Sequence, residues 1–458
     1  MSIYTHGMEH NHSATDPAAE APLLFALGPG VPPPAQPPPV DPKRGARLRE
    51  VNRSQMLWGR IDLDAQLPED HAARSIWTVI ERLDLSALYT QIEARDEVAG
   101  TPAIDPKILL ALWVFATSEG EGSAREIWRL TELHAAYRWL CGGVQVGYHT
   151  LSDFRSQQGE IIDDLITQVL ALLMQQDLVD LCRVAQDGTR IRASAGASSF
   201  RREQTLERLL QQAREHLEAV TREAADPALS ARRAAARKRG AAQRLARLEA
   251  AVKQIPEVAE TKKRSGAKDK TARVSTTDPD ARVMKMGDGG FRPAYNVQFA
   301  TTTDAARVIV GVEVTNRGSD MGESTPMLEQ IEQRTGVRPN ELLIDGGYPQ
   351  HDAIDEAAKQ EVTVYAPVPT PREGDTRCPH TPHEGDSAAV AEWRQRMGTE
   401  EAKLIYRQRA ATAETVNADA KQHRGLDAMH VRGLEKVAGS AALFVLTYNL
   451  LRLLTLGG

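Results

Sequence analysis

The stretch Glu341-Leu-Leu-Ile-Asp-Gly-Gly-Tyr-Pro349 decides the fold of this chain. Its apolar run, Leu342 to Ile344, is short and ends at an acid and two glycines, which is typical of a fully buried strand in a mixed sheet. Asp345 would therefore lie at the carboxyl end of the strand, where open α/β sheets place their sites. The glycines would let the chain turn away and leave the carboxylate uncovered. Alternatively, Asp345 caps the next helix, from His351 onward.

The composition is that of a globular protein with two or three domains. Of 458 residues, 41% are hydrophobic and 26% charged, which excludes a largely disordered chain. No 18 uninterrupted apolar residues and no basic-then-apolar leader occur, so we expect no membrane segment and a cytoplasmic location. The three cysteines (Cys141, Cys182 and Cys378) are far apart and odd in number, which predicts a reducing setting without disulfides.

Charge is unevenly distributed along the chain. The formal net charge of −6 argues at first against a nucleic-acid partner. Residues 231–273, however, contain 14 Lys and Arg against 4 Asp and Glu. Such a segment is either the solvated face of a helix or a surface that attracts the phosphates of a nucleic acid.

The amino-terminal part divides into two regions of different character. Residues 1–45 are rich in Pro, Ala and Gly, which predicts a disordered tail. Residues 46–176 carry helical patterns; one helix begins at Asp105-Pro106, with a capping residue followed by proline. This helical region is equally well interpreted as a DNA-binding module or as a dimerisation domain.

A basic helical hairpin is predicted at 201–275. Its first part is charged and rich in Ala and Leu, and a break near Asp226-Pro227 separates two long helices. The second helix carries the basic residues Arg232, Arg233, Arg237, Lys238, Arg239, Arg244 and Arg247.

The remainder, 177–458, reads as alternating strands and helices. Leu181 to Arg192 alternates as a strand does, although its Asp187-Gly188 pair is equally a hairpin signal. One Cys and two His within 378–383 lack the paired spacing of a zinc site, so we set zinc aside. Further elements are expected as a strand hairpin at 295–314, a helix at 324–334, a helix at 353–359, a strand at 362–366, a loop at 367–398, a long helix at 400–423 and an apolar helix at 439–453.

This order resembles a ribonuclease H-like core, an α/β fold with a mixed sheet flanked by helices. Such a core predicts a third acid on the long helix near the carboxyl end, and Glu414 is the candidate. Arg407, Glu414 and Lys421 are seven residues apart, so they share one helix face.

Together these motifs resemble the DDE transposases of bacterial insertion sequences, over about residues 50–455. The resemblance rests on several motifs in the same order: Val184–Ala193, Leu342–Tyr348, Tyr406–Arg409 with Glu414 and Lys421, Asp280–Lys285 with Gly290–Gln298, Tyr148–Arg155, and Arg432–Lys436.

The resemblance implies Asp187, Asp345 and Glu414 as catalytic ligands of two Mg²⁺ or Mn²⁺ ions. It also implies DNA contacts by Tyr406, by Lys421 and by Arg409. The family's Tyr-Arg-Glu-Lys signature has three residues between Arg and Glu, whereas four separate Arg409 from Glu414 here. Arg407 is therefore an alternative for the arginine. Arg237, Lys238 and Arg239 are the expected DNA contacts of the hairpin.

The implied activity is nicking of element ends and their joining to target DNA, by a homodimer or larger complex on double-stranded DNA in the bacterial cytoplasm, at the nucleoid. Two alternatives remain: a transposase-derived protein that binds DNA without cutting it, and a helical scaffold whose hairpin is only a solvated coiled coil.

Overall fold

The computed structural model describes residues 62–92, 102–223, 231–264, 266, 271–371 and 377–457, and the structural statements below concern these residues. They belong to one compact unit, residues 61–458. The predicted tail, 1–45, and the break expected near Asp226-Pro227 lie outside the described residues.

Seven helices precede the first strand within the described ranges. They are α1 (Ala72–Ile80), α2 (Ser86–Thr90), α3 (Pro106–Ser118), α4 (Ala124–Leu133), α5 (Ala135–Cys141), α6 (Tyr148–Gln157) and α7 (Gly159–Gln175). Local sequence signals set their boundaries: the Asp105 side chain accepts the N–H of Lys107 at the start of α3, and Pro106 follows at the first helical position. Nearly every residue of α3 is buried, in keeping with its uniformly apolar sequence.

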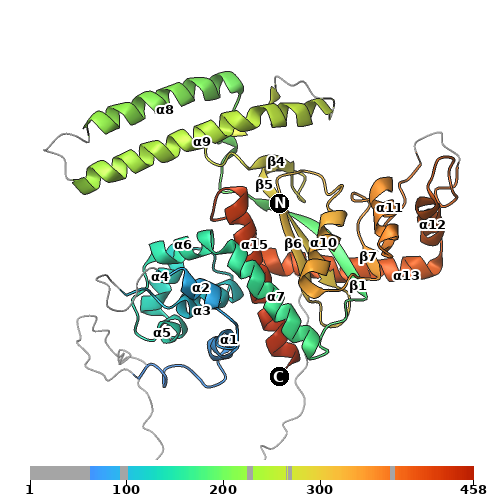
Figure 1. Ribbon diagram of the computed structural model, residues 1–458, viewed down its shortest axis with the longest axis horizontal. Coiled ribbons are helices and arrows are strands. Elements are labelled where there is room, and N and C mark those ends of the chain that lie inside the picture. The colour runs from blue at the N-terminus through green and yellow to red at the C-terminus, as the bar shows by residue number, and fades with distance from the viewer. Residues whose placement is uncertain are drawn as a thin grey trace, which may run out of the picture. The chain divides into compact units, whose positions relative to one another are not determined.

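A six-stranded mixed sheet follows (Figure 1). Its strands are β1 (Arg183–Arg192), β4 (Arg282–Lys285), β5 (Phe291–Thr302), β6 (Ile309–Thr315), β7 (Glu341–Leu343) and β8 (Thr363–Tyr365). The order is β4-β5-β1-β7-β8, with β6 also paired to β5. β1, β7 and β8 run parallel, whereas β5 pairs antiparallel with β1, β4 and β6. This is the ribonuclease H-like arrangement that the order of elements predicted.

The helices of the sheet region are α10 (Ser324–Thr335), α11 (His351–Lys359), α12 (Ala388–Met397), α13 (Glu400–Arg409), α14 (Thr415–Ala418) and α15 (Leu434–Leu456). The prediction of a loop at 367–398 is wrong for residues 388–397, which form α12. Ser387 caps this helix by accepting the N–H of Val390, and the indole N–H of buried Trp393 donates to the carbonyl of Ala366 at 3.1 Å. Burial of Trp393 beside β8 fixes a helix within a segment whose Pro, Gly and Asp content indicated a loop.

The basic insertion is a pair of long helices, α8 (Glu203–Glu223) and α9 (Ala231–Arg264), which pack against each other. Buried residues recur every seven positions, as in a coiled coil. They are Leu206, Ala213 and Val220 on α8, and Ala234, Ala241, Leu248 and Ile255 on α9. Short strands β2 (Phe200–Arg201) and β3 (Val274–Ser275) pair at the base of the two helices.

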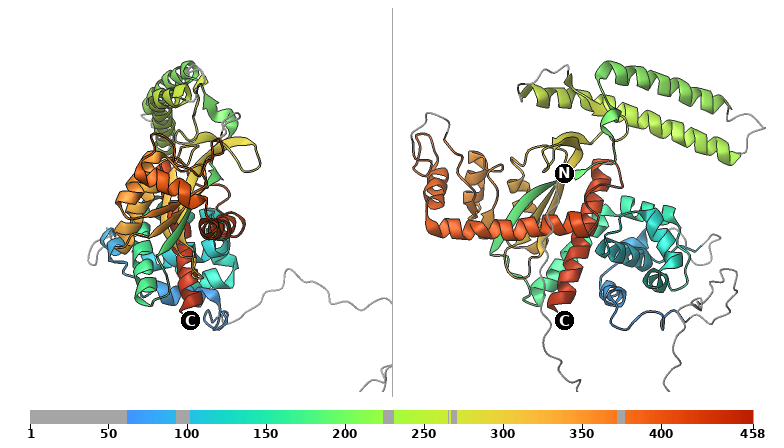
Figure 2. Two further views of the ribbon diagram at one scale, coloured as in Figure 1. Left: turned by 90° about the vertical axis from the view of Figure 1, so that its right-hand side faces the viewer. Right: turned by 180° about the vertical axis from the view of Figure 1, so that it is seen from behind.

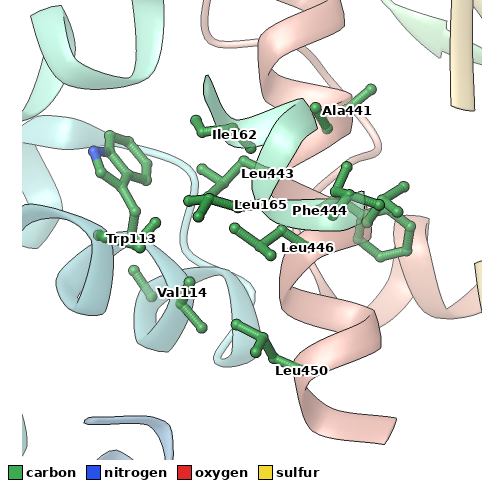
Figure 3. Packing of buried hydrophobic residues seen from close by; sticks show 14 of the residues in the cluster. Trp113, Val114, Ile162, Leu165, Ala441, Leu443, Phe444, Leu446 and Leu450 are labelled. Atoms are coloured by element: carbon green, nitrogen blue, oxygen red, sulfur yellow. The ribbon is translucent and has the colours of Figure 1, made fainter. Parts of the chain in front are cut away.

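Helix α15 joins the amino-terminal helices and the sheet in one hydrophobic cluster (Figure 3). It packs on α3, α7 and β6, and the ring of Phe444 lies 5.3 Å from that of Phe299. Gly439 allows a close approach to α7, since a Cβ there would lie 3.3 Å from the Cα of Gly159. By length and composition α15 could cross a membrane, but 67% of its most apolar window is buried, as in a core helix.

Two carboxylates hold the start of α15. Asp278 accepts the N–H of Gly433 at 3.1 Å and the hydroxyl of Tyr295 at 2.8 Å, and Asp280 accepts the N–H of Leu434 at 2.9 Å. Gly433 has a φ of +90°, which favours glycine. The motifs around Asp280 and Gly433 therefore meet at a junction that positions the core helix.

Candidate active site

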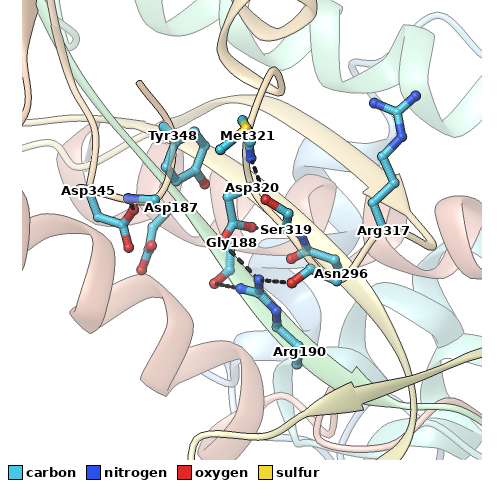
Figure 4. Close-up of polar contacts among 12 residues, drawn as sticks. Asp187, Gly188, Arg190, Asn296, Arg317, Ser319, Asp320, Met321, Asp345 and Tyr348 are labelled. Carbon is cyan, nitrogen blue, oxygen red and sulfur yellow. Dashed lines mark hydrogen bonds and ion pairs between the residues drawn. The ribbon is translucent and has the colours of Figure 1, made fainter. Parts of the chain in front are cut away.

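Strand register brings Asp187, in the middle of β1, level with Asp345, which lies just beyond the carboxyl end of β7. In the parallel pair β1–β7, Ala185 is the partner of Leu343, the last residue of β7. Each aspartate follows its strand's member of this pair by two residues, so the two side chains leave neighbouring strands at the same level. Figure 4 shows the two carboxylates side by side.

The turn after β7 leaves the Asp345 carboxylate available. The N–H of Gly347 donates to Asp345 Oδ1 at 2.6 Å, and the side chain is 39% exposed. Helix α11 begins at His351 with Gln350 as its capping residue, so the alternative in which Asp345 caps this helix is wrong.

Arg409, at the end of α13, lies against both carboxylates. Its Nη2 is 2.8 Å from Asp187 Oδ1 and 3.7 Å from Asp345 Oδ2. Burial raises the pKa of Asp187; the Arg409 guanidinium acts to lower this pKa and the Asp345 carboxylate to raise it. Two carboxylates that face the same position can supply some of the oxygen ligands that a divalent metal ion takes.

A π-helical turn, Ala410–Glu414, explains the extra residue in the Arg-to-Glu spacing. A wider turn absorbs one inserted residue without ending the helix, and such turns are frequent at functional sites. The helical run from α13 therefore continues to His423, through a second π turn (Figure 2). Arg409 reaches the aspartates, whereas Arg407 is exposed.

Asn417 contacts the second carboxylate oxygen of Asp187, the one that Arg409 does not. Its Nδ2 donates to Asp187 Oδ2 at 2.8 Å, while its Oδ1 is buried and has no hydrogen-bond partner among the described residues. The Nε of Arg409 is likewise buried and unpaired. Neither feature was predicted from the sequence, because an asparagine within a helical run carries no signal of its own.

Lys421 and Tyr406 are half-buried on the same helical run. Burial lowers the pKa of Lys421, and nearby Arg190 lowers it further, while Asp187 raises it. Burial also raises the pKa of Tyr406; Arg409 acts to lower this pKa and Asp345 to raise it. Both predicted DNA-contact residues therefore lie close enough to the aspartates to interact with them electrostatically.

Glu414, at the end of the π turn, has an exposed side chain. Within the described ranges, no group of three or more His, Cys, Asp or Glu side chains is close enough to share a metal ion. Of the three predicted metal ligands, the structure brings together Asp187 and Asp345, which both face the Arg409 guanidinium. The structure does not bring Glu414 into this pair.

A buried polar platform lies behind Asp187 (Figure 4). Asp320 Oδ1 accepts hydrogen bonds of 2.7 Å from Asn296 and from Gln298, and its Oδ2 accepts one of 2.9 Å from Arg190. Asp320 follows β6 in a loop, and the sequence does not indicate that it contacts Arg190 of β1. Gly188 lies in β1 next to this platform, so the Asp-Gly pair is part of a strand and the hairpin alternative is wrong.

Arg237, Lys238 and Arg239 are all exposed on α9. Arg237 pairs with Glu223 of α8 at 2.7 Å. The hairpin is anchored to the sheet through Gln254, whose Oε1 accepts a 2.7 Å hydrogen bond from Arg282 of β4. These basic side chains are carried on α9, which contacts the sheet through this hydrogen bond.

Glu323 makes the stability of this region depend on pH. Its side chain is 2% exposed, and burial raises its pKa to about 7, with Glu313 and Asp320 adding to the effect and Arg317, 3.5 Å away, opposing it. Because the folded state holds this proton more tightly than the unfolded state, the carboxyl costs stability progressively as pH rises from about 4.5 to about 7.

Glu323→Gln, which mimics the protonated form, is therefore expected to stabilise the protein by about 2 kcal/mol at pH 8 and by little at pH 4.5. Thermal unfolding of variant and wild type at both pH values measures this. Glu329→Gln, an exposed change on α10, the helix that begins directly after Glu323, serves as the control. An equal gain at both pH values would mean that the effect is not titration of Glu323.

Two segments of the chain match protein-family models. Residues 61–157 match the model described as Transposase domain (DUF772), and residues 372–454 match the model described as Transposase DDE domain. The first segment includes α1 to α6, and the second includes the helical run with Arg409, Asn417 and Lys421. Comparisons with curated proteins and with solved structures give no match.

Proposed function

We propose that the chain, two segments of which match transposase domain models, is a DDE transposase of an insertion sequence that nicks the ends of its element and joins them to target DNA by two-metal-ion phosphoryl transfer. The observation that carries the proposal is the convergence of Asp187 and Asp345 on a single cation, the Arg409 guanidinium.

Asp187, Asp345 and Glu414 are the residues proposed to hold the metal. Their hard oxygen ligands suit Mg²⁺ or Mn²⁺. When bound, two such ions would activate the attacking water or 3′-hydroxyl and stabilise the leaving oxygen. In this proposal all three carboxylates would together hold the two ions. Glu414 lies on the helical run one turn before Asn417, which contacts Asp187.

The cationic side chains around the aspartates are proposed to hold the phosphate beside the scissile bond. Arg409 and Lys421 supply positive charge next to Asp187, and Tyr406 lies on the same helical run. Exposed Arg407 is proposed to contact the DNA backbone farther from that bond. Phosphate neighbours of this kind orient the strand but do not read its sequence.

Domain roles and assembly complete the proposal. Residues 46–176 would serve as a DNA-binding or dimerisation domain, and 177–458 as the catalytic domain interrupted by the insertion 201–275. Bringing two element ends together requires at least a homodimer on double-stranded DNA, in the bacterial cytoplasm and at the nucleoid.

The hairpin is proposed as a non-specific DNA contact. Changing Arg237, Lys238 and Arg239 to alanine together is expected to weaken DNA binding and to reduce its salt dependence. The slope of log K against log salt should fall by about 0.9 for each lost phosphate contact, or about 2.7 at most. Binding titrations at several salt concentrations measure this slope. Lys359→Ala, an exposed lysine paired with Glu356, is the control, and an unchanged slope would leave the hairpin as a solvated coiled coil.

The test of the function is Mg²⁺-dependent nicking of DNA that carries the ends flanking the gene. Cleavage by the wild-type protein supports the proposal. Binding of the ends without cleavage, under Mg²⁺ and under Mn²⁺, would instead support the alternative of a catalytically inactive, transposase-derived DNA-binding protein.

A further inference from the structure

We infer that Asn417 is a further ligand of the metal site, through its side-chain oxygen. The inference rests on the proposed function, because it concerns the cation that Asp187 and Asp345 would share. It adds an amide to a site otherwise assigned only carboxylates.

One polar atom of the Asn417 side chain is left without a partner among the described residues, and a bound metal ion would supply one. Its Nδ2 donates to Asp187 Oδ2 at 2.8 Å, but its Oδ1 is buried and has no partner. Buried amide oxygens are nearly always paired, and an unpaired one costs free energy. The amide that carries the unpaired atom is bonded to Asp187, whose other oxygen accepts a hydrogen bond from the Arg409 guanidinium.

The Asn417 amide can bond to Asp187 when no metal is bound and to the metal when one is. Its nitrogen donates and its oxygen accepts, and a half-turn of the planar group exchanges their positions. Against a carboxylate without metal, the N–H is the favourable partner, as observed. With a divalent cation on Asp187, the oxygen becomes favourable, and asparagine carbonyls are established ligands of hard cations.

The π turn directs the Asn417 side chain toward Asp187. Asn417 follows Arg409 by eight residues, which in a regular α-helix would turn the two side chains about 80° apart. Both nevertheless contact Asp187, one from each side of the π turn Ala410–Glu414. The wider turn thus aligns Asn417 with Arg409.

The test exchanges the proposed oxygen for sulfur in the full-length protein. Asn417→Cys is expected to bind Cd²⁺ with a thiolate-to-cadmium charge-transfer absorption in the ultraviolet, because a soft ligand favours a soft metal. The same variant should lose Mn²⁺ affinity, measured by the electron paramagnetic resonance of free Mn²⁺. Asn417→Leu should lose it by about tenfold or more.

Two controls separate ligation from other effects. Gln408→Cys, on the exposed side of α13, should give no absorption above the wild-type background of three native cysteines. Adding Asp187→Asn to Asn417→Cys should remove the absorption, which tests whether the two residues share one cation. Circular dichroism checks that each variant is folded.

The outcomes are distinct. Wild-type Mn²⁺ affinity in Asn417→Leu, or no cadmium absorption in folded Asn417→Cys, would overturn the inference while the carboxylate site stands. Failure of the wild-type protein to bind Mn²⁺ at all would overturn the proposed metal chemistry, and this inference with it.

Discussion

Alanine at Asp187 or at Asp345 is expected to reduce Mg²⁺-dependent nicking by about a thousandfold or more, equivalent to about 4 kcal/mol of transition-state stabilisation. Both carboxylates face the Arg409 guanidinium, and removing either takes away one of the three proposed metal ligands. DNA binding should persist, because the basic side chains of α9 are unchanged. Nicking is followed on end-bearing DNA, and binding by electrophoretic mobility shift.

Glu414→Ala is expected to have the same effect, and it is the more demanding test. Its side chain is exposed, and the part of the chain that the structure describes contains no three-residue metal cluster. If Glu414→Ala still cuts while both aspartate variants fail, the third acid is wrongly assigned, and Glu400 and Glu401 of α13 become the candidates. Glu392→Ala, an acid with a 75% exposed side chain on α12, should cut normally.

The positions of the two aspartates could be predicted from sequence because strand geometry is simple. Side chains alternate along a strand, and the carboxyl ends of parallel neighbours coincide at one edge. The apolar run before Asp345 therefore indicated a strand that ends at the acid. The alternating run around Asp187 indicated a strand but left a hairpin at Asp187-Gly188 as an equal alternative, and Asp187 lies in the middle of β1. Parallel pairing of β1 with β7 confirms this part of the fold.

The choice between Arg407 and Arg409 could not be made from sequence. A regular helical period puts Arg407 in phase with Glu414 and Lys421. The π turn breaks that period and directs Arg409 to the aspartates, while Arg407 faces solvent. Whether a helix absorbs an extra residue depends on what the following side chains contact, and here that includes Asn417 on Asp187.

Asp320 and α12 were missed for a related reason. Asp320 follows β6 in a loop and acquires its role only because the fold brings it to Arg190 and Asn296. Helix α12 is stabilised by burial of Trp393, which a local pattern rich in loop residues does not indicate. Both depend on contacts between segments far apart in sequence, whereas propensity reports only neighbours.

Gly188→Ala is expected to destabilise the protein by about 3 kcal/mol and to impair nicking. A Cβ at this position would overlap Asp320 Oδ1 and Gln298 Nε2, and would lie 2.9 Å from Asn296 Oδ1. These side chains cannot move aside cheaply. Gln298 is fully buried between Asp320 and the hydroxyl of Tyr348, to which it is also hydrogen-bonded. Because Gly188 directly follows Asp187, a shift of the strand would also displace the carboxylate that we propose to be catalytic.

Thermal unfolding and the nicking assay measure the two effects, with Gly196→Ala as the matched control. There the nearest atom to a new Cβ is Ser198 Oγ at 3.6 Å, an ordinary contact, so stability should change by less than about 0.5 kcal/mol. Asp320→Ala removes one of the overlapping atoms. The double variant Gly188→Ala/Asp320→Ala should therefore be less destabilised than the sum of the two single changes. If the two single losses of stability simply add, the side chains of the polar platform move aside at little cost in free energy. Packing against Asp320 is then not the reason why glycine is needed after Asp187.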